Sequence, residues 1–228
     1  MPEQISHTFP KIIWQTHNHK KEDMPEHISH AAATWKNLNP GWDYRYVDHD
    51  QRDEMVRAYP EIYQTYKDQT PVFQSDIWRF LVTYEYGGCY ADMDSICVKP
   101  LDYLLQDIDP LTEIVTVPKK QGYGNTHNYV VKPKTKAISE VFEKMNRYAK
   151  ILQEHRAFLI FIKTIYEYED TSQLFIVQTE HNSIEDVAAM HDHNYKSSFD
   201  ISEHKVNNYG TIVDYLEFIN EKGLSPTI

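Results

Sequence analysis

The sequence predicts an α/β fold in which a mostly parallel central sheet is flanked by helices. Strand and helix patterns alternate through the first half of the chain, which is the order that builds a parallel sheet. The chain has 228 residues, 41% of them hydrophobic, so it can bury a core without help from disulfides or metals. No repeat or low-complexity linker interrupts it, and residues 1–228 are expected to form a single domain.

Apolar periodicity and turn residues define the expected elements of the first half. They are a strand at 11–15 (KIIWQ), a helix at 25–37, a strand at 43–48 (DYRYVD), a helix that Asp50 caps and that reaches Tyr59, and a helix that begins at Pro71. Gly87-Gly88 is expected to end this last helix, because glycine is the common residue after a helix C-terminus. The chain then enters CYADMD, a predicted strand that ends in carboxylates.

The second half gives weaker patterns. Strands are expected at 114–118 and 129–132, a long helix at 136–148 with a continuation to 160, and an amphipathic helix at 209–221. The Gly-rich stretch 119–125 fits either a flexible substrate loop or a plain hairpin turn.

Charge and cysteine usage limit the partners and the compartment. The net charge is −11, with 34 acidic and 23 basic residues, which argues against nucleic acids and anionic membranes as partners. No stretch approaches the roughly 20 apolar residues of a membrane helix, and the N-terminus lacks the pattern of a secretory signal. A cytoplasmic protein is therefore expected, although a chain trimmed of an anchor would look the same. Cys89 and Cys97 are either reduced or paired with each other.

The sharpest chemical feature is Asp92-Met93-Asp94. In a strand, residues i and i+2 point to the same side, so the two carboxylates would converge. Two such carboxylates are stable together only if a cation, a proton or a basic group compensates them, and hard oxygen ligands suit Mg²⁺ or Mn²⁺. The alternative is a solvated strand end with no bound metal. On the preceding helix, Asp76 and Arg79 lie one turn apart and form either an exposed ion pair or a set of contacts to sugar and phosphate.

The residues around these motifs resemble a known family. The run QSDIWRF at 74–80 followed by YEYGGCYADMD at 84–94 is similar to the signature of DXD glycosyltransferases. These are the capsular-polysaccharide and outer-chain-initiating mannosyltransferase group, family 32, to which the catalytic domains of clostridial glucosylating toxins are related. Further similarity lies at FPKIIWQT (9–16), WKNLNP (35–40), YRYVD (44–48) and KPLD (99–102), so it covers about residues 9–105.

The resemblance implies a GT-A-like fold, a nucleoside-diphosphate sugar as donor, Mn²⁺ or Mg²⁺, and retention at the anomeric carbon. Residues 9–105 would form the nucleotide-sugar half and residues 106–228 the acceptor half. Asp76 and Arg79 would contact the donor sugar, Asp92 the sugar or ribose together with the metal, and Asp94 the metal. The site residues implied for the nucleotide are Ile13, Trp14, Gln15, Thr16 and Tyr90. Trp14 stands where the family usually has His, and its indole either stacks on the base or belongs to the core.

The resemblance weakens in the second half. Asn128, in NYVVKP, matches an asparagine near the acceptor, and a turn asparagine is the alternative. The stretch MHDHNYKSSF at 190–199 is similar to a family ending in which His193 would be a third metal ligand, with His191 as the alternative, and Ser198 a donor contact. A Gly-Pro segment usual in the family is absent from 171–180.

The predicted function is metal-dependent transfer of a sugar from a nucleoside-diphosphate sugar to a hydroxyl acceptor, which would be a glycan, a lipid-linked group or a protein. A metal-dependent phosphohydrolase and a non-catalytic sugar-nucleotide-binding module are the alternatives. The sequence leaves the oligomeric state open.

Overall fold

A sheet of six strands in the order β2-β1-β3-β8-β5-β9 forms the centre of the computed structural model. Its strands are β1 (Ile12–Thr16), β2 (Asp43–Val47), β3 (Gly88–Ala91), β5 (Ile114–Thr116), β8 (Asn128–Val131) and β9 (Leu174–Ile176). The structure describes residues 8–97, 99–106, 108–116, 118–119, 123–124, 128–148, 174–176, 188–190, 205–206 and 210–211. Only β8 runs against the other strands of this sheet, so the prediction of a mostly parallel α/β sheet is confirmed.

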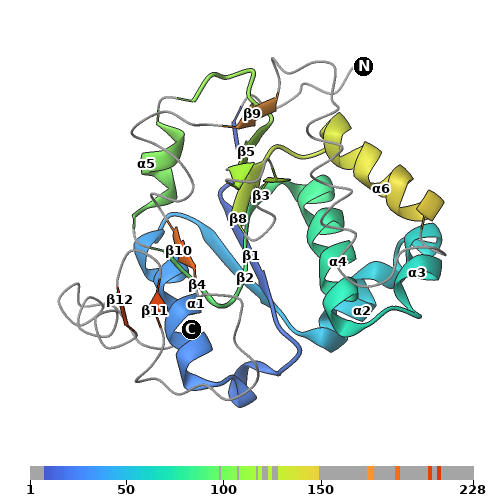
Figure 1. The fold of residues 1–228 in the computed structure, drawn as a ribbon, viewed down its shortest axis with the longest axis horizontal. Coiled ribbons are helices and arrows are strands. Elements are labelled where there is room, and N and C mark those ends of the chain that lie inside the picture. The colour runs from blue at the N-terminus through green and yellow to red at the C-terminus, as the bar shows by residue number, and fades with distance from the viewer. Residues whose placement is uncertain are drawn as a thin grey trace.

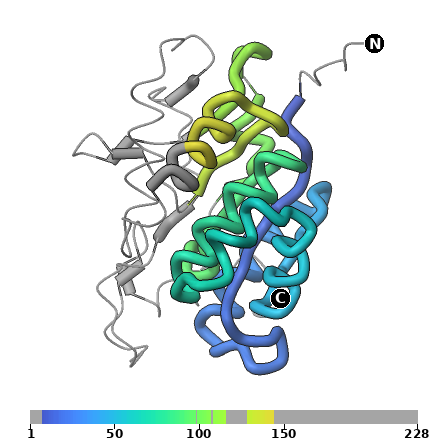
Figure 2. Tube along the Cα trace, turned by 90° about the vertical axis from the view of Figure 1, so that its right-hand side faces the viewer, coloured from blue at the N-terminus to red at the C-terminus, as the bar shows by residue number. Residues whose placement is uncertain are grey.

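Helices cover both faces of this sheet. They are α1 (Glu26–Leu38), α2 (His49–Arg57), α3 (Pro60–Tyr66), α4 (Pro71–Tyr86), α5 (Leu101–Leu105) and α6 (Lys136–Tyr148), with a short 3-10 turn at Lys21–Asp23. Figure 1 shows α1 and α5 on one side of the strands and α2, α3, α4 and α6 on the other. Figure 2, turned by 90°, looks onto the layer that contains α3 and α4.

Alternating strand residues supply two separate cores. On the α4 face, Trp14, Tyr90 and Tyr129 pack with buried residues of α2, α3, α4 and α6. On the α1 face, Ile13, Cys89 and neighbouring strand residues pack against Trp35, Trp42 and the apolar side of α5. This alternation follows from the period of two along a strand, and it explains why these strands are apolar on both sides.

Three small strand pairs lie beside the main sheet. β4 (Ser95–Cys97) pairs with β10 (Ala188–Met190), β6 (Pro118–Lys119) with β7 (Tyr123–Gly124), and β11 (Lys205–Val206) with β12 (Gly210–Thr211). The β6–β7 pair confirms a hairpin in the Gly-rich stretch. The segment expected to open the C-terminal helix contains β12 instead, and the rest of that predicted helix lies outside the described residues, as does the continuation of α6 to residue 160.

The second helix begins earlier than predicted. Its N-cap is Asp48 and not Asp50, because Asp48 accepts a hydrogen bond from the Gln51 backbone N–H at 2.9 Å. The Gln51 side chain accepts one in return from the Asp48 backbone at 3.0 Å, which completes a capping box. A proline at residue 60 starts a separate helix, α3, which the sequence analysis did not anticipate.

Helix α4, which positions two predicted site residues, has clear signals at both ends. Thr70 caps its start, where its side chain accepts from the Phe73 backbone N–H, and Pro71 occupies the first turn. Gly87 ends it with φ at +66°, and Gly88 follows at +99°, both in a region that favours glycine. The expected end of this helix at Gly87-Gly88 is confirmed.

Gly88→Ala is expected to destabilise the fold by at least about 2 kcal/mol, because it adds backbone strain and a steric clash. A Cβ at Gly88 would lie 2.5 Å from the backbone oxygen of Ile12, at the start of the strand that leads to Asp92. Gly41→Ala is the matched control, since a Cβ there meets nothing within 4 Å. Urea unfolding of both variants measures the difference, and equal midpoints would contradict the account.

Both cysteines are buried and free, which settles the open alternative in favour of reduced thiols. Burial raises the pKa of the Cys97 thiol to about 12. Along the described residues, no helix combines the length and the apolar character needed to cross a bilayer.

Candidate functional site

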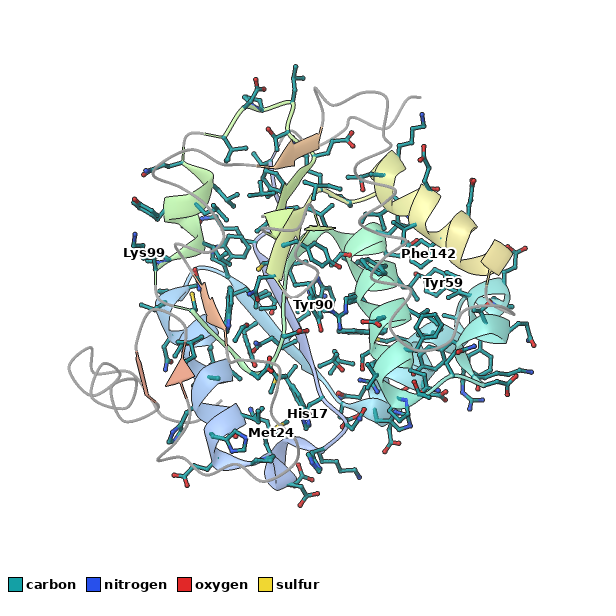
Figure 3. The ribbon with its side chains drawn as sticks, viewed as in Figure 1. His17, Met24, Tyr59, Tyr90, Lys99 and Phe142 are labelled. Atoms are coloured by element: carbon teal, nitrogen blue, oxygen red, sulfur yellow. The ribbon has the colours of Figure 1, made fainter. Side chains whose placement is uncertain are left out.

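The candidate site lies where the carboxyl ends of β1 and β3 meet. From β1 the chain crosses through α1 to β2 on one side, whereas β3 is followed by strands on the other side. The loops that follow two such strands diverge, and ligands of open α/β sheets bind in the crevice between them. His17 follows β1 and Asp92 follows β3. Figure 3 shows His17 beyond the strand end and Tyr90 deeper in the molecule.

Asp92-Met93-Asp94 forms a turn and not a continuous strand. β3 ends at Ala91, and the Ser95 backbone N–H donates to the Asp92 carbonyl at 3.1 Å to close the turn before β4. Met93 is 4% exposed and anchors the turn in the core. Asp92 and Asp94 on either side of it are partly exposed. The predicted i, i+2 strand geometry is therefore replaced by a turn whose central side chain is buried.

The backbone of this turn is held from β1. The Gln15 side-chain amide donates to the Asp92 carbonyl at 3.1 Å. The Tyr44 hydroxyl in turn donates to Gln15 Oε1 at 2.7 Å, and Gln15 itself is fully buried. Gln15 thus positions the turn from beneath, while the nucleotide contact that the family resemblance implies for it stays a prediction.

The Asp92 carboxylate is oriented by two neighbours. The Tyr90 hydroxyl donates to Asp92 Oδ1 at 2.7 Å, and Arg79 Nη1 lies 3.5 Å from the same oxygen. Tyr90 is 1% exposed, so this phenol fixes the carboxylate from the buried side, while its predicted nucleotide contact stays a prediction. The orientation of Asp92 is thereby set before any ligand arrives.

Arg79 connects the two predicted carboxylate motifs. Its Nη2 lies 2.8 Å from Asp76 Oδ1 on the same helix, and its guanidinium lies 4.5 Å from the centre of the Tyr90 ring. Arg79 is only 7% exposed. Burial by itself disfavours the charged form, but Tyr90, Asp92 and Asp76 outweigh it and raise the pKa of Arg79 above its ordinary value. The pair is therefore a buried charge cluster, and the alternative of an exposed ion pair is wrong.

Asn128 lies at the same edge, beneath the turn. It begins β8, pairs in register with Ala91, and is 1% exposed. Its Oδ1 is 3.0 Å from Ser95 Oγ, which also lies 2.7 Å from the Asp92 carbonyl. The buried Trp35 indole donates to the Ser95 carbonyl at 2.9 Å. Asn128 therefore joins the frame of the turn, while its predicted part near an acceptor stays a prediction.

The remaining β1 residues point into the two cores or brace the sheet edge. Ile13 is fully buried on the α1 face. Trp14 is 2% exposed, donates to the Gly87 carbonyl at 2.9 Å and meets Trp78 edge-on, which supports the core alternative for its indole. Thr16 donates to the Val47 carbonyl at 2.6 Å. Their predicted nucleotide contacts stay predictions.

Two predicted site residues, His193 and Ser198, lie outside the described residues, as does the alternative ligand His191. The stretch in which the Gly-Pro segment is absent lies mostly outside them as well. Their proposed contacts remain predictions from the family resemblance.

Sequence reasoning missed three residues of this edge. Tyr44 and Ser95 hold the turn, and Arg52 braces the loop after β1. Each also bonds a residue that is distant along the chain, since Tyr44 contacts Gln15, Ser95 contacts Asn128 and Arg52 contacts Thr16. Among the three, Tyr44 had a local signal in the sequence, because it lies in the alternating pattern of β2, the strand that pairs with β1.

The described part of the chain offers two carboxylates for a metal. Within it, no group of three or more His, Cys, Asp or Glu side chains could hold an ion alone. Asp92 and Asp94 provide hard oxygen donors on a partly exposed turn, and such donors fit Mg²⁺ or Mn²⁺ when phosphate and water oxygens complete the shell. The residues present therefore fit a metal that a phosphate-bearing ligand shares.

Comparison with known proteins gives a family match. Residues 25–113 match the family described as glycosyltransferase sugar-binding region containing DXD motif. The mannosyl phosphorylinositol ceramide synthase SUR1 of Saccharomyces cerevisiae is 35% identical over 101 residues, which are 42% of this chain and 25% of that protein. Inositol phosphoceramide mannosyltransferase 3 of Schizosaccharomyces pombe is 34% identical over 103 residues, which are 44% and 28% of the two chains. The matched part spans about a quarter of the length of these curated relatives.

The fold also has a solved counterpart. The structure described as PaToxG Glycosyltransferase superposes with a TM-score of 0.50 and 15% sequence identity, covering 72% of this chain and 70% of that chain. At this identity the likeness concerns the fold alone. It confirms the predicted GT-A-like α/β architecture.

Proposed function

Because residues 25–113 carry the sugar-binding region of the DXD glycosyltransferases, we propose that this protein transfers a sugar from a nucleoside-diphosphate sugar to a hydroxyl acceptor in a metal-dependent reaction. One observation carries the proposal. The Asp92–Asp94 turn lies at the crevice between β1 and β3, and Asp92 is pre-oriented there by Tyr90 and Arg79.

Each side chain of the proposed site has a task that follows from its chemistry. Asp92 and Asp94 would hold Mn²⁺ or Mg²⁺, which when bound offsets the charge of the diphosphate as it leaves. Arg79 keeps a positive charge beside Asp92 and adds to that compensation. Asp76, fixed by Arg79, would accept hydrogen bonds from sugar hydroxyls. Catalysis of this kind rests on positioning and electrostatics, and no side-chain nucleophile is assigned.

Mannose is the proposed sugar, with a guanosine diphosphate carrier as the first donor to test. The names of both reported relatives specify a mannosyl product or activity. The acceptor is proposed only as a hydroxyl group on a glycan, lipid or protein. Retention of the anomeric configuration, a third metal contact by His193 and a donor contact by Ser198 are proposed from the family resemblance.

The proposal predicts that one sugar nucleotide will stabilise the protein only when a metal is present. A ligand that binds the folded state alone must raise the melting temperature, by an amount that grows with its concentration over its Kd. A thermal-shift panel of GDP-, UDP- and dTDP-sugars, each with and without Mn²⁺, identifies the donor. We expect GDP-mannose with Mn²⁺ to give the largest shift.

The same panel separates the alternatives. Stabilisation by a nucleoside diphosphate regardless of its sugar, together with phosphate release, would favour the phosphohydrolase. Stabilisation by a sugar nucleotide without turnover on any hydroxyl acceptor would favour a binding module. If no sugar nucleotide shifts the melting temperature with any metal, the proposed donor site is wrong.

A further inference from the structure

Arg52 occupies an unusual position behind the proposed donor site. Its side chain is fully buried, yet it joins three separate parts of the fold. Nη1 donates to Thr16 Oγ1 at 3.0 Å and to Ser75 Oγ at 2.7 Å. Nη2 donates to Asn18 Oδ1 at 2.8 Å and lies 3.1 Å from His49 Nδ1. Arg52 therefore ties the loop after β1 to α2 and to α4.

None of these four partners is a carboxylate, and Thr16, Ser75 and Asn18 are uncharged side chains. Within the described ranges, no carboxylate lies within ion-pair distance of Arg52. Of the acids close to it along the chain, Asp48 caps α2, Asp53 pairs with Arg57 at 2.5 Å, and Asp50 and Glu54 are exposed. A guanidinium stays protonated in proteins, so this corner holds a buried positive charge that no carboxylate of the described residues pairs.

The histidines around Arg52 offer no negative charge that could neutralise its guanidinium. His17, in the loop that Arg52 braces, has its pKa lowered to about 4, first by burial and then by His19, Arg52 and His27. It is therefore neutral near pH 7. His49 lies beside Arg52 with Nδ1 at 3.1 Å from Nη2, and an imidazole offers no negative charge to pair with a guanidinium. Arg52 thus supplies the fixed positive charge of this corner.

The bonds of Arg52 place its charge next to the proposed donor site. Thr16 is the last residue of β1, at the crevice, and Ser75 directly precedes Asp76, the partner of Arg79. A charge beneath a crevice acts on a ligand through the low-dielectric interior, where screening by salt is weak. A nucleoside diphosphate in that crevice would bring the negative charge that the described residues do not place beside Arg52.

We propose that Arg52 is a positioning and charge-compensating residue for the donor diphosphate: it fixes the loop after β1 and attracts the anionic part of the ligand without touching it. This inference rests on the proposed function. A merely structural role would act through the hydrogen bonds of Arg52 alone. The inference assigns part of the diphosphate affinity to the charge of Arg52 as well.

Asn18→Asp tests the charge while leaving Arg52 in place. Asn18 is exposed, and aspartate has the same shape, so the hydrogen bond to Nη2 is kept and becomes an ion pair. Gln64→Glu, on an exposed position of α3, is the control for one added negative charge. The measured quantities are the Kd values of GDP and UDP with Mn²⁺, those of guanosine and uridine, and the melting temperature of each variant.

In Asn18→Asp we expect the Kd of the bound nucleoside diphosphate to rise about tenfold, since a nearby carboxylate cancels the field of Arg52. The Kd of the matching nucleoside should change less than about twofold, and the melting temperature should stay the same or rise, because a buried charge gains a partner. Gln64→Glu should change none of these values.

Arg52→Lys and Arg52→Gln provide an independent comparison, because the first keeps the charge and the second keeps part of the hydrogen bonding. We expect the preference for the nucleoside diphosphate over the matching nucleoside, measured as the ratio of their Kd values, to be lost in Arg52→Gln and kept in Arg52→Lys. Equal losses for both ligands, or unchanged diphosphate binding in Asn18→Asp, would overturn the inference. Failure of the wild-type chain to bind GDP or UDP would instead refute the proposed function, and the inference would fall with it.

Discussion

Asp94→Asn is expected to lower kcat/KM for sugar-nucleotide turnover at least about 100-fold, the scale seen when one group that stabilises transition-state charge is removed. Asp94 lies on the partly exposed side of the turn whose central residue, Met93, is buried. The amide keeps the shape of the carboxylate but loses its charge, so the fold should persist while metal binding weakens. Release of the nucleoside diphosphate in the presence of Mn²⁺ measures the effect.

Asp43→Asn is the matched control for this substitution. Asp43 begins β2, at the opposite end of the sheet, and pairs with Arg45 at 2.6 Å in an exposed position. The same chemical change there removes a surface ion pair, which contributes little. Turnover in Asp43→Asn should equal that of the wild type. A comparable loss in both variants would show that the effect is not specific to the turn.

Arg79→Lys is expected to lower turnover by a similar factor of about 100. The lysine ammonium lacks the planar guanidinium whose two terminal nitrogens contact Asp76 and Asp92 together. Arg79 lies within 2.8 Å of one carboxylate and 3.5 Å of the other, and is almost fully buried. A lysine would also leave one buried carboxylate poorly compensated, so stability should fall by about 1–3 kcal/mol. Steady-state kinetics and urea unfolding measure the two effects separately.

Arg57→Lys controls for the loss of a guanidinium in an arginine–aspartate pair. Arg57 pairs with Asp53 one turn away at 2.5 Å, as Arg79 does with Asp76, but its side chain is 62% exposed. Solvent screens such a pair, so neither stability nor turnover should change measurably. Full turnover in Arg79→Lys would contradict the assignment of Arg79 to the donor site.

Local signals in the sequence were enough to predict the elements that build the site. Gly87-Gly88 marked the end of α4, and the structure gives the physical reason in two positive φ values. The spacing of Asp76 and Arg79 placed them one turn apart, and the ion pair confirms it. Alternating and apolar runs identified β1, β2 and β3, because their two-sided burial leaves a pattern in the residues themselves.

Tertiary contacts decided what the sequence could not show. Asp48 and Asp50 are both acceptable N-caps, and only the reciprocal bond with Gln51 selects Asp48. The burial of Trp14 and Gln15 depends on α4 and on the Asp92 turn, which are more than 50 residues away along the chain. Arg52 is one of several charged residues on an amphipathic helix, and nothing local distinguishes it as the one that is fully buried.

The donor Kd of the wild type and of Asp94→Asn, each with Mn²⁺ and with a chelator, tests the central claim most directly. If Asp94 holds a metal that the diphosphate shares, Mn²⁺ should tighten donor binding by the wild type at least about tenfold, which corresponds to about 1.4 kcal/mol. It should leave binding by Asp94→Asn unchanged. Equal tightening in both proteins, or none in the wild type, would contradict a metal-bridged donor site at the Asp92–Asp94 turn.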